Sequence, residues 1–293
     1  MENPLQRMCG GMKFIIAGSG GCVCTPKPLC QCRVCTEARQ RGYPYRRCGC
    51  SLYLDDCALL VDTPEDIAVA LNNAGIKAVD NILYSHWDPD HTLGMRIMEQ
   101  LRLEWLDYYD NKVPVNPIHV YALEQVLADV RQIGGKYGSF LDYYAQMGLI
   151  DCRIVKDSIA IGDVEITFVP VRQKKPVSVF VFASKGKKLV YAPCDCRPFP
   201  AAGVMENADV LIIGNTVVGD VLKNGRIIGP DHPLRKELHT VSDVLEIADR
   251  LHIKKTVITH IEEDWGKSFS DYLSLEKSYQ NLNFAYDGMV VEL

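Results

Sequence analysis

Four side chains that can bind a metal ion follow directly on a short apolar run: His86, Asp88, Asp90 and His91. Imidazole nitrogens and carboxylate oxygens are common ligands of divalent ions, and two His/Asp pairs on one segment can point at two neighbouring ions. Pro89 restricts the backbone between the two pairs. A solvated polar loop is the alternative, but so many ligands after an apolar run favour a metal centre.

A second set of metal-binding side chains consists of three thiols, those of Cys30, Cys32 and Cys35. Cysteines this close along the chain cannot easily reach disulfide geometry with one another. They suit one tetrahedral zinc ion, as in a zinc knuckle. Free cysteines, buried or on the surface, are the alternative.

The elements that position these residues follow from the apolar pattern. The run 82–84 predicts a buried strand with the His/Asp segment on the loop at its C-terminal end, where α/β proteins commonly hold their sites. Further strands are expected at 12–17, 59–61, 114–121, 164–171, 177–183, 189–192, 210–213 and 256–259. Helices are expected at 64–72, 93–109, 124–133 and 239–252. The segment 134–140 is expected to be a loop, which with Tyr143 and Tyr144 either covers the site or only packs.

Length and composition indicate one folded unit. The chain has 293 residues and 47% hydrophobic content, so a single domain over 1–293 is expected. Twelve cysteines in a chain of this size, with no apolar leader and no run that could span a bilayer, indicate a reducing cytoplasm and no membrane partner. A net charge of −5 and a pI near 5.8 disfavour extended binding to nucleic acid.

The pattern H-x-D-x-D-H at 86–91 resembles the H-x-H-x-D-H hallmark of the metallo-β-lactamase fold superfamily. Supporting matches recur in the family's order at 14–21, 59–63, 191–195 and 257–260. The resemblance implies an α/β fold, a four-layer αββα sandwich. It also implies that Asp195 bridges two ions and that His260 completes the second site with Asp90 and His91.

The sequence departs from the family's pattern at the first metal site. Asp88 stands where the family has a histidine. The family's hairpin histidine is also missing, since its position falls on Gln173 or a neighbour among Arg172, Lys174 and Lys175. The first site keeps His86 and Asp195 and gains Asp88. A carboxylate in place of an imidazole shifts the preference from zinc toward iron, manganese or magnesium, and one or two active-site ions of zinc, manganese or iron are expected.

Within the superfamily, the cysteine-rich insert near 22–50 resembles the branch that contains the cyclic phosphodiesterase of phosphonate degradation and the pyrroloquinoline-quinone biosynthesis protein. The resemblance implies a structural zinc. The fourth ligand in the phosphodiesterase lies three residues beyond the last-strand histidine, which here is Glu263. Either this carboxylate completes the site, or Cys22 or Cys24 does.

The branch also places a histidine near the substrate phosphate, which here is His239, while the alternative is that it caps a helix with Thr240. The resemblance implies a phosphodiesterase of small cyclic or nucleotide-like phosphates, in which Asp195 and Asp90 hold the ions that activate water and His239 protonates the leaving oxygen. Two other functions stay open, a metal-dependent oxidoreductase or oxygenase related to quinone-cofactor biosynthesis and a non-catalytic metal-binding protein. A homodimer is expected only by association with the fold.

Overall fold

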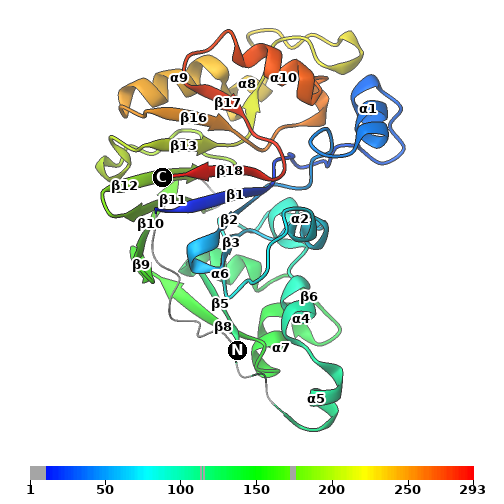
Figure 1. Ribbon diagram of the computed structural model, residues 1–293, viewed down its shortest axis with the longest axis vertical. Coiled ribbons are helices and arrows are strands. Elements are labelled where there is room, and N and C mark those ends of the chain that lie inside the picture. Colours follow the sequence, from blue (N-terminus) through cyan, green and yellow to red (C-terminus); the bar gives the residue numbers. More distant parts are fainter. Residues whose placement is uncertain (1–10, 113, 115, 172–175) are drawn as a thin grey trace.

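The computed structural model describes residues 11–112, 114, 116–171 and 176–293. Two mixed sheets of seven strands each face one another, and helices cover their outer faces (Figure 1). The expected αββα sandwich is therefore confirmed. Among the helices of the described residues, none has both the length and the apolar character that crossing a bilayer requires.

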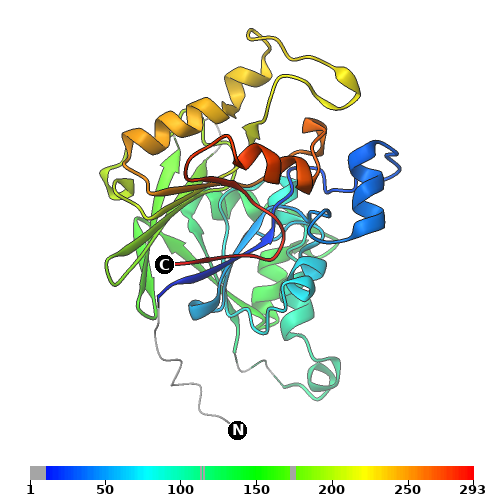
Figure 2. The same cartoon turned by 45° about the horizontal axis from the view of Figure 1, so that its top comes forward.

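The first sheet pairs the first strand of the chain with the last one (Figure 2). In this antiparallel pair, Lys13 lies opposite Glu292. From edge to edge its strands are β18 (Met289–Glu292), β1 (Lys13–Gly18), β2 (Ser51–Leu54), β3 (Leu59–Val61), β4 (Asn81–Leu83), β5 (Ile118–Leu123) and β8 (Ile150–Val155). Strands β3, β4, β5 and β8 run parallel, so their carboxyl ends meet at one edge.

The second sheet combines a hairpin region with a parallel region. Its strands, in order, are β17 (Leu282–Phe284), β16 (Lys255–Ile258), β13 (Val210–Ile213), β12 (Lys187–Ala192), β11 (Val177–Ser184), β10 (Val164–Val171) and β9 (Ser158–Ile161). Strand β10 alternates, with Val164 and Ile166 buried and Glu165 exposed, as expected for a strand with one covered face. Strand β13 is buried throughout, as expected for a parallel strand covered on both faces.

The space between the sheets is filled by aromatic and aliphatic side chains from both inner faces. Phe14 of β1 meets Phe182 of β11 edge to face at 5.2 Å, and Phe168 meets Phe180 in the same way at 5.0 Å. Burying one such ring stabilises the fold by about 1.5–3 kcal/mol. The packing between the sheets therefore sets the spacing of the strands whose ends carry the candidate site.

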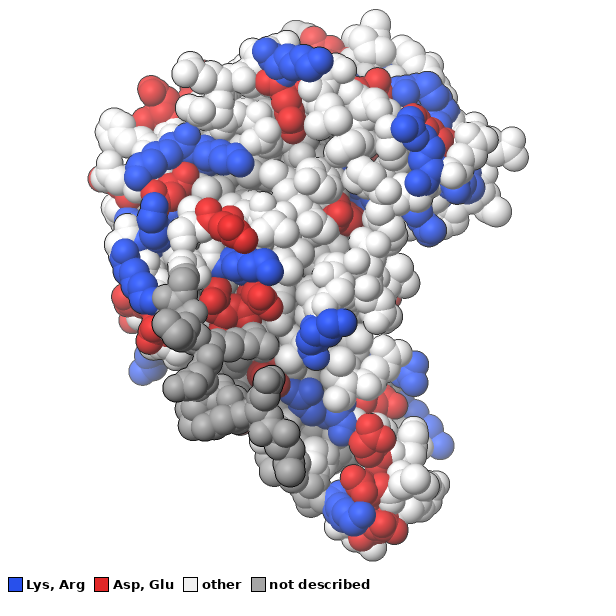
Figure 3. All heavy atoms as spheres, viewed as in Figure 1, with Lys and Arg blue, Asp and Glu red and all other residues white. Residues whose placement is uncertain are grey.

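Two further apolar layers attach the helices. The outer face of the first sheet is covered by α2 (Ile67–Asn73), α4 (Ile97–Arg102), α6 (Glu124–Val130) and α7 (Phe140–Gln146). The second sheet is covered by α9 (Val241–Arg250) and α10 (Phe269–Glu276), with α8 (Leu234–Glu237) nearby. The remaining helices are α1 (Arg33–Arg41) of the cysteine-rich insert, α3 (Pro89–Thr92) and α5 (Trp105–Tyr109). On the face shown in Figure 3, basic and acidic side chains are interspersed.

Two expected helices differ from the structure. The helix expected at 93–109 is wrong as one element, because Gly94 approaches the chain before α2 and Leu103 and Glu104 are extended. The Gly94 N–H donates to the Thr63 carbonyl, and a Cβ at Gly94 would lie 1.9 Å from the Pro64 carbonyl oxygen. This tertiary contact overrides the apolar periodicity, so the helices there are α4 and α5.

The helix expected at 239–252 begins two residues later, because His239 and Thr240 form strand β15 (His239–Thr240) beside β14 (Thr216–Val217). Thr240 then caps α9 through a reciprocal bond pair with Asp243. The helix expected at 64–72 is α2, which starts at Ile67. The segment expected to be a loop at 134–140 contains the small hairpin β6 (Gly134–Gly135) and β7 (Gly138–Ser139).

Candidate metal centre

The candidate site lies where strands of both sheets end. Asp62 follows β3, the His/Asp segment follows β4, Cys194 and Asp195 follow β12, and His260 follows β16. In the segments that follow these strands, three residues have a left-handed backbone. Their φ values are 64° at Asp62, 46° at Asp195 and 49° at His260. Each such conformation costs a non-glycine residue about 1–2 kcal/mol. Backbone strain of this kind concentrates at functional sites.

One group of potential ligands consists of His86, His91 and Cys194, whose ligand atoms all lie within 4.8 Å of one another. The Ser85 hydroxyl lies 2.8 Å from Nδ1 of His86 and so leaves Nε2 for a ligand. This Nε2 is buried without a hydrogen-bond partner among the described residues. Asp88 lies beside it, with 3.6 Å between Oδ2 and Nε2.

A second group consists of Asp90, His91 and His260, again within 4.8 Å. Nδ1 of His91 lies 2.9 Å from Oδ2 of Asp62, and its Nε2 is buried without a hydrogen-bond partner among the described residues. Nε2 of His260 lies 3.3 Å from Oδ2 of Asp90. The His91 and His260 rings stack at 5.3 Å. The two groups share His91 and therefore form one centre.

Asp62 orients both sides of this centre, a role that the sequence reasoning missed. Its carboxylate accepts bonds from the Ser85 N–H at 2.8 Å and the Ser85 hydroxyl at 2.6 Å, besides its contact with His91. A carboxylate on the far nitrogen of a histidine fixes the tautomer that presents the other nitrogen to a metal. The available signal was its place directly after the apolar run 59–61.

The electrostatics of the centre suit a bound cation. Burial raises the pKa of the Asp90 carboxyl, but the bond with His260 and the charges of His91 and His260 outweigh it and lower this pKa. Burial lowers the pKa of His260, but the Cys194 charge and the Asp90 contact raise it well above its usual value. Buried ligand atoms that converge without hydrogen-bond partners are suited to a divalent ion. The potential ligands among the described residues therefore fit such an ion.

The thiol of Cys194, the neighbour of Asp195, lies with the ligand atoms of His86 and His91, and it also interacts with His260. The bridging role expected of Asp195 stays a prediction. Oδ1 of Asp195 lies 3.6 Å from the thiol of Cys194 and 3.3 Å from the side-chain amide of Asn215. Strand β12 ends at Ala192, and the backbone makes a left-handed turn at Asp195. The sequence shows both residues but not this turn.

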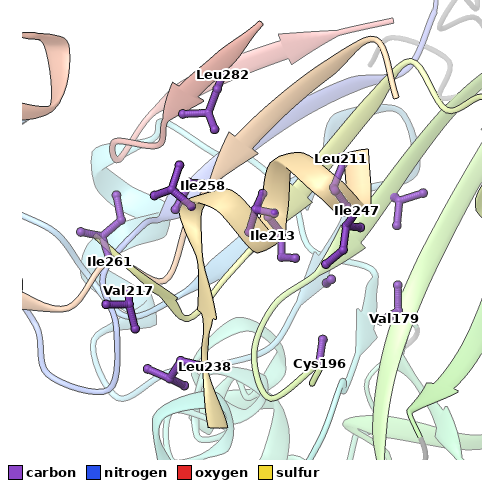
Figure 4. Close-up of a cluster of buried hydrophobic side chains, with 14 of the residues drawn as sticks. Val179, Cys196, Leu211, Ile213, Val217, Leu238, Ile247, Ile258, Ile261 and Leu282 are labelled. Carbon is purple, nitrogen blue, oxygen red and sulfur yellow. The ribbon is translucent and has the colours of Figure 1, made fainter. Parts of the chain in front are cut away.

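The apolar core above the second sheet anchors the loops of the centre. Figure 4 shows Cys196, Leu238 and Ile261 among its buried side chains. Cys196 lies two residues from Cys194, and Ile261 is next to His260. The loops that carry these ligands are thus held by packing on either side of β13, which limits how far the donor atoms can move apart.

His239 lies outside both ligand groups. Its Nε2 lies 3.3 Å from the Cys196 carbonyl oxygen, and its ring packs against Phe199. A cavity of about 370 Å³ beside it is lined by Arg197, Asp243 and other residues, none of which belongs to the two groups. Burial, assisted by the charge of Arg197, lowers the pKa of His239. Its role as an acid stays a prediction, as do the ligand roles of Asp88 and Asp195.

The cysteine cluster is defined as Cys30, Cys32, Cys35 and Glu263, whose ligand atoms lie within 4.8 Å of one another. Oε1 of Glu263 lies 3.5, 3.1 and 3.0 Å from the three sulfurs in chain order. Burial raises the pKa of Glu263, but bonds from Cys35, Lys223 and Cys32 lower it to about 2. The Lys27 N–H also donates to the Cys35 sulfur at 3.3 Å.

Of the three expected fourth ligands, the structure brings Glu263 to the thiols. The Cys22 thiol instead points at Glu262 at 3.6 Å, and the Cys24 thiol at the Pro26 carbonyl at 3.7 Å. The position of the missing hairpin histidine, on Gln173 or its neighbours Arg172, Lys174 and Lys175, lies outside the described residues.

Glu262 connects the cysteine-rich insert with the metal centre. Its Oε1 accepts the Cys22 N–H at 3.0 Å and lies 3.4 Å from Nδ1 of His260. Gly21 permits this approach, because a Cβ there would lie 2.2 Å from the Glu262 carboxylate. Glu262 therefore faces the metal centre while its neighbour Glu263 faces the cysteine cluster.

Comparisons with known proteins agree with this architecture. The profile of the Beta-lactamase superfamily domain matches residues 58–261. A structure described as a new diphosphatase from the PhnP family superposes with a TM-score of 0.70 at 20% identity, covering 97% of this chain and 98% of that one.

Two further structures show the same fold. Zn²⁺-bound PqqB from Methylobacterium extorquens has a TM-score of 0.69 at 18% identity, covering 96% of this chain and 100% of that one. The short form of human tRNase Z has 0.59 at 15% identity, covering 96% and 99%. No curated protein sequence matches the chain. Its matched profile spans most of its length, and the chain thus belongs to the beta-lactamase superfamily, with the metallo-β-lactamase fold.

Proposed function

We propose that this protein is a metal-dependent hydrolase that cleaves phosphodiesters of small cyclic or nucleotide-like compounds. The observation that carries the proposal is the pair of ligand groups that share His91, with buried nitrogens that lack hydrogen-bond partners among the described residues. Two adjacent cation positions are typical of enzymes that hydrolyse phosphate esters. If these histidines only packed in the core, we would expect their buried nitrogens to have hydrogen-bond partners.

The ligands proposed for the ions are His86 and Cys194 on one side and Asp90 and His260 on the other. His91 lies between them, and its one available nitrogen can serve only one ion. The thiol makes the donor set softer than the expected carboxylate bridge, which favours zinc over manganese. A divalent ion in this centre would supply Lewis-acid activation of water and neutralise charge on the phosphate.

The protein's own groups have distinct tasks in this proposal. Asp62 and Glu262 hold the rings of His91 and His260 in the orientation that a ligand nitrogen needs. His239 is the proposed donor of the proton to the leaving oxygen. Its lowered pKa would make the protonated ring a stronger acid but a less populated one at neutral pH.

The names of similar folds support the choice of substrate class. They include a diphosphatase, a tRNase Z and the yeast protein PDE1, at 20%, 15% and 9% identity. At such identities the similarity shows a shared fold only, so the argument for the chemistry rests on the residues of the site. The sequence also resembles the phosphodiesterase branch at its cysteine-rich insert, whose three thiols lie together with Glu263 in the cysteine cluster.

The proposal is tested with protein purified without added ions, by metal analysis and by hydrolysis of bis(4-nitrophenyl) phosphate with and without added zinc. We expect zinc beyond the one ion of the cysteine cluster, and turnover that a chelator removes. The double change Asp90→Asn with His260→Gln should abolish turnover, while the exposed Asp163→Asn should not. A single redox-active iron without hydrolysis would overturn the proposal in favour of an oxidoreductase, and zinc in the cysteine cluster alone would favour a non-catalytic protein.

A further inference from the structure

A cavity of about 400 Å³ lies beside the segment that carries the metal ligands. Leu93 and Met95 form part of its wall, and they directly follow α3, which holds Asp90 and His91. The rest of the wall comes from α4, the β6–β7 hairpin and α7. Its volume falls in the range of about 300–1,000 Å³ that is usual for small-molecule sites. None of the proposed metal ligands lines it, so the hydrolytic centre does not account for it.

The cavity is lined by aromatic rings in parallel arrangement. Tyr137 stacks on Tyr143 with ring centroids 5.5 Å apart and planes 15° apart. Phe140 stacks on Tyr144 at 6.3 Å, also at 15°. Rings that serve only a core are buried, but Tyr137, at the tip of the hairpin, is 71% exposed. Although Tyr143 packs on one face of this ring and the Lys136 ammonium lies 5.5 Å from its centre, this exposure leaves the outer side of the Tyr137–Tyr143 pair accessible to a flat ligand.

The hairpin that presents Tyr137 is built for a fixed position. A Cβ at Gly134 would lie 2.4 Å from the Gly138 carbonyl oxygen, so only glycine allows the two short strands to approach this closely. Ser139 then caps α7 by accepting the Asp142 N–H at 3.4 Å. The aromatic residues of α7 thus follow the hairpin without a flexible connection.

The charged groups of the cavity favour an anion. Arg96 and Lys136 line it, against the single carboxylate of Glu99, so its wall is net positive although the whole chain carries −5. Nε of Arg96 is 3.8 Å from Oε2 of Glu99, and its side chain is 68% exposed, which leaves the guanidinium accessible. Arg and Lys next to open aromatic rings are the combination that recognises a base attached to a phosphate.

From these observations we infer that the cavity binds the planar base of a nucleotide, which stacks on the exposed side of the Tyr137–Tyr143 pair while Arg96 and Lys136 face its phosphate. The inference deepens the proposed function, on which it rests, by naming nucleotides as the substrate class. Stacking on aromatic side chains contributes about 1–3 kcal/mol per base, which corresponds to roughly 5- to 150-fold in affinity.

The test compares the binding of adenosine 5′-monophosphate with that of ribose 5-phosphate, which lacks the base, by calorimetric titration of the purified protein. We expect the nucleotide to bind at least about fivefold more tightly. Tyr137→Ala and Tyr143→Ala should reduce this ratio toward one, while Arg96→Gln should weaken both ligands and leave the ratio unchanged. The matched control is Tyr109→Ala, since this tyrosine is 77% exposed on α5, away from the cavity lining.

Equal affinity of the two ligands for the unaltered protein would overturn the inference, and so would a ratio that survives both tyrosine changes. Because Tyr137 is largely exposed, Tyr137→Ala should keep the fold, and an unchanged melting temperature checks this. The readout is binding, so it is separate from turnover. A base-dependent ratio without hydrolysis of bis(4-nitrophenyl) phosphate would refute the hydrolase and support the cavity, and the reverse pattern would refute the cavity alone.

Discussion

Nδ1 of His91 lies 2.9 Å from Oδ2 of Asp62, and both side chains are fully buried. The same carboxylate accepts two bonds from Ser85, whose hydroxyl contacts His86. One buried acid at the end of β3 thus orients histidines of both ligand groups. Its removal should therefore affect the whole centre.

Asp62→Asn should lower zinc affinity by about 10–100-fold, the usual loss when a supporting contact to a metal-bound histidine is removed. Competition with a chromogenic chelator measures this affinity. The control is Asp163→Asn, which makes the same replacement of a carboxylate by an amide at an exposed residue in the turn between β9 and β10. It should leave zinc affinity unaltered. Unchanged affinity in Asp62→Asn would show that Asp62 only stabilises the fold.

Cys194→Ser should weaken zinc binding more than Asp195→Asn does, because the thiol lies within 4.8 Å of the ligand atoms of His86 and His91. A lost ligand should exceed the roughly 10–100-fold effect of a lost supporting contact. The same change should also reduce the preference for zinc over manganese, since it replaces a soft donor by a hard one. A larger loss in Asp195→Asn would restore the bridge that the sequence resemblance implies.

Cys32→Ser should release one zinc per chain and lower the melting temperature, because the cysteine cluster would lose one of its four donors. Atomic absorption and thermal unfolding measure the two effects. Cys152→Ser is the matched control, since Cys152 belongs to neither the cysteine cluster nor the metal centre. Full zinc content in Cys32→Ser would exclude the cluster as a zinc site.

His239→Ala should slow hydrolysis of an alkyl phosphodiester by about 10²–10⁴-fold while the metal content stays constant. Bis(4-nitrophenyl) phosphate should be affected far less, because its leaving group needs no proton. His119→Gln, at a histidine of β5 outside both ligand groups, serves as the control. Equal losses on the two substrates would remove His239 from the acid role.

The pH dependence of stability should contain a contribution from Asp287. Burial raises the pKa of this carboxyl to about 6, although it accepts bonds from the Cys48 and Ser19 N–H groups. A folded-state pKa above the unfolded value of about 3.9 means that the folded protein holds the proton more tightly. This contribution is fully present below about pH 4 and is lost as the pH rises through 6.

Asp287→Asn cannot titrate, so the free energy of unfolding of the variant should fall less than that of the unaltered protein between pH 4.5 and 6.5. The decrease in the free energy of unfolding over this pH range should be larger in the unaltered protein than in the variant by on the order of 2 kcal/mol. Urea unfolding at both pH values measures it. A variant with the same slope as the unaltered protein would mean that Asp287 is charged throughout.

Much of the centre could be predicted because its residues are close along the chain or follow an obvious strand. His86, Asp90 and His91 come from one segment, and His260 ends the last inner strand of the family pattern. Asp62 was not predicted as an orienting group, because this role depends on contacts with Ser85 and His91. These contacts arise only when β3 and β4 pair.

Other features depend on single backbone conformations that composition and periodicity do not encode. The backbone after β12 is left-handed at Asp195, next to the thiol that lies with His86 and His91, and the contact of Gly94 with Thr63 interrupts a helical pattern. The sandwich could be predicted because apolar runs such as 164–171 form strands, and β10 begins with alternating buried and exposed residues. The short hairpin around Tyr137 has too few residues for such a pattern.

The neighbouring carboxylates Glu262 and Glu263 serve opposite sides of one short segment. The insert reaches the metal centre through the backbone N–H of Cys22, which Glu262 accepts. Sequence alignment would draw the insert near 22–50 as a detachable module. A chimera that deletes the insert, or transplants it into a relative without a matching glutamate pair, would also change the support of His260, because Glu262 contacts both the insert and this histidine.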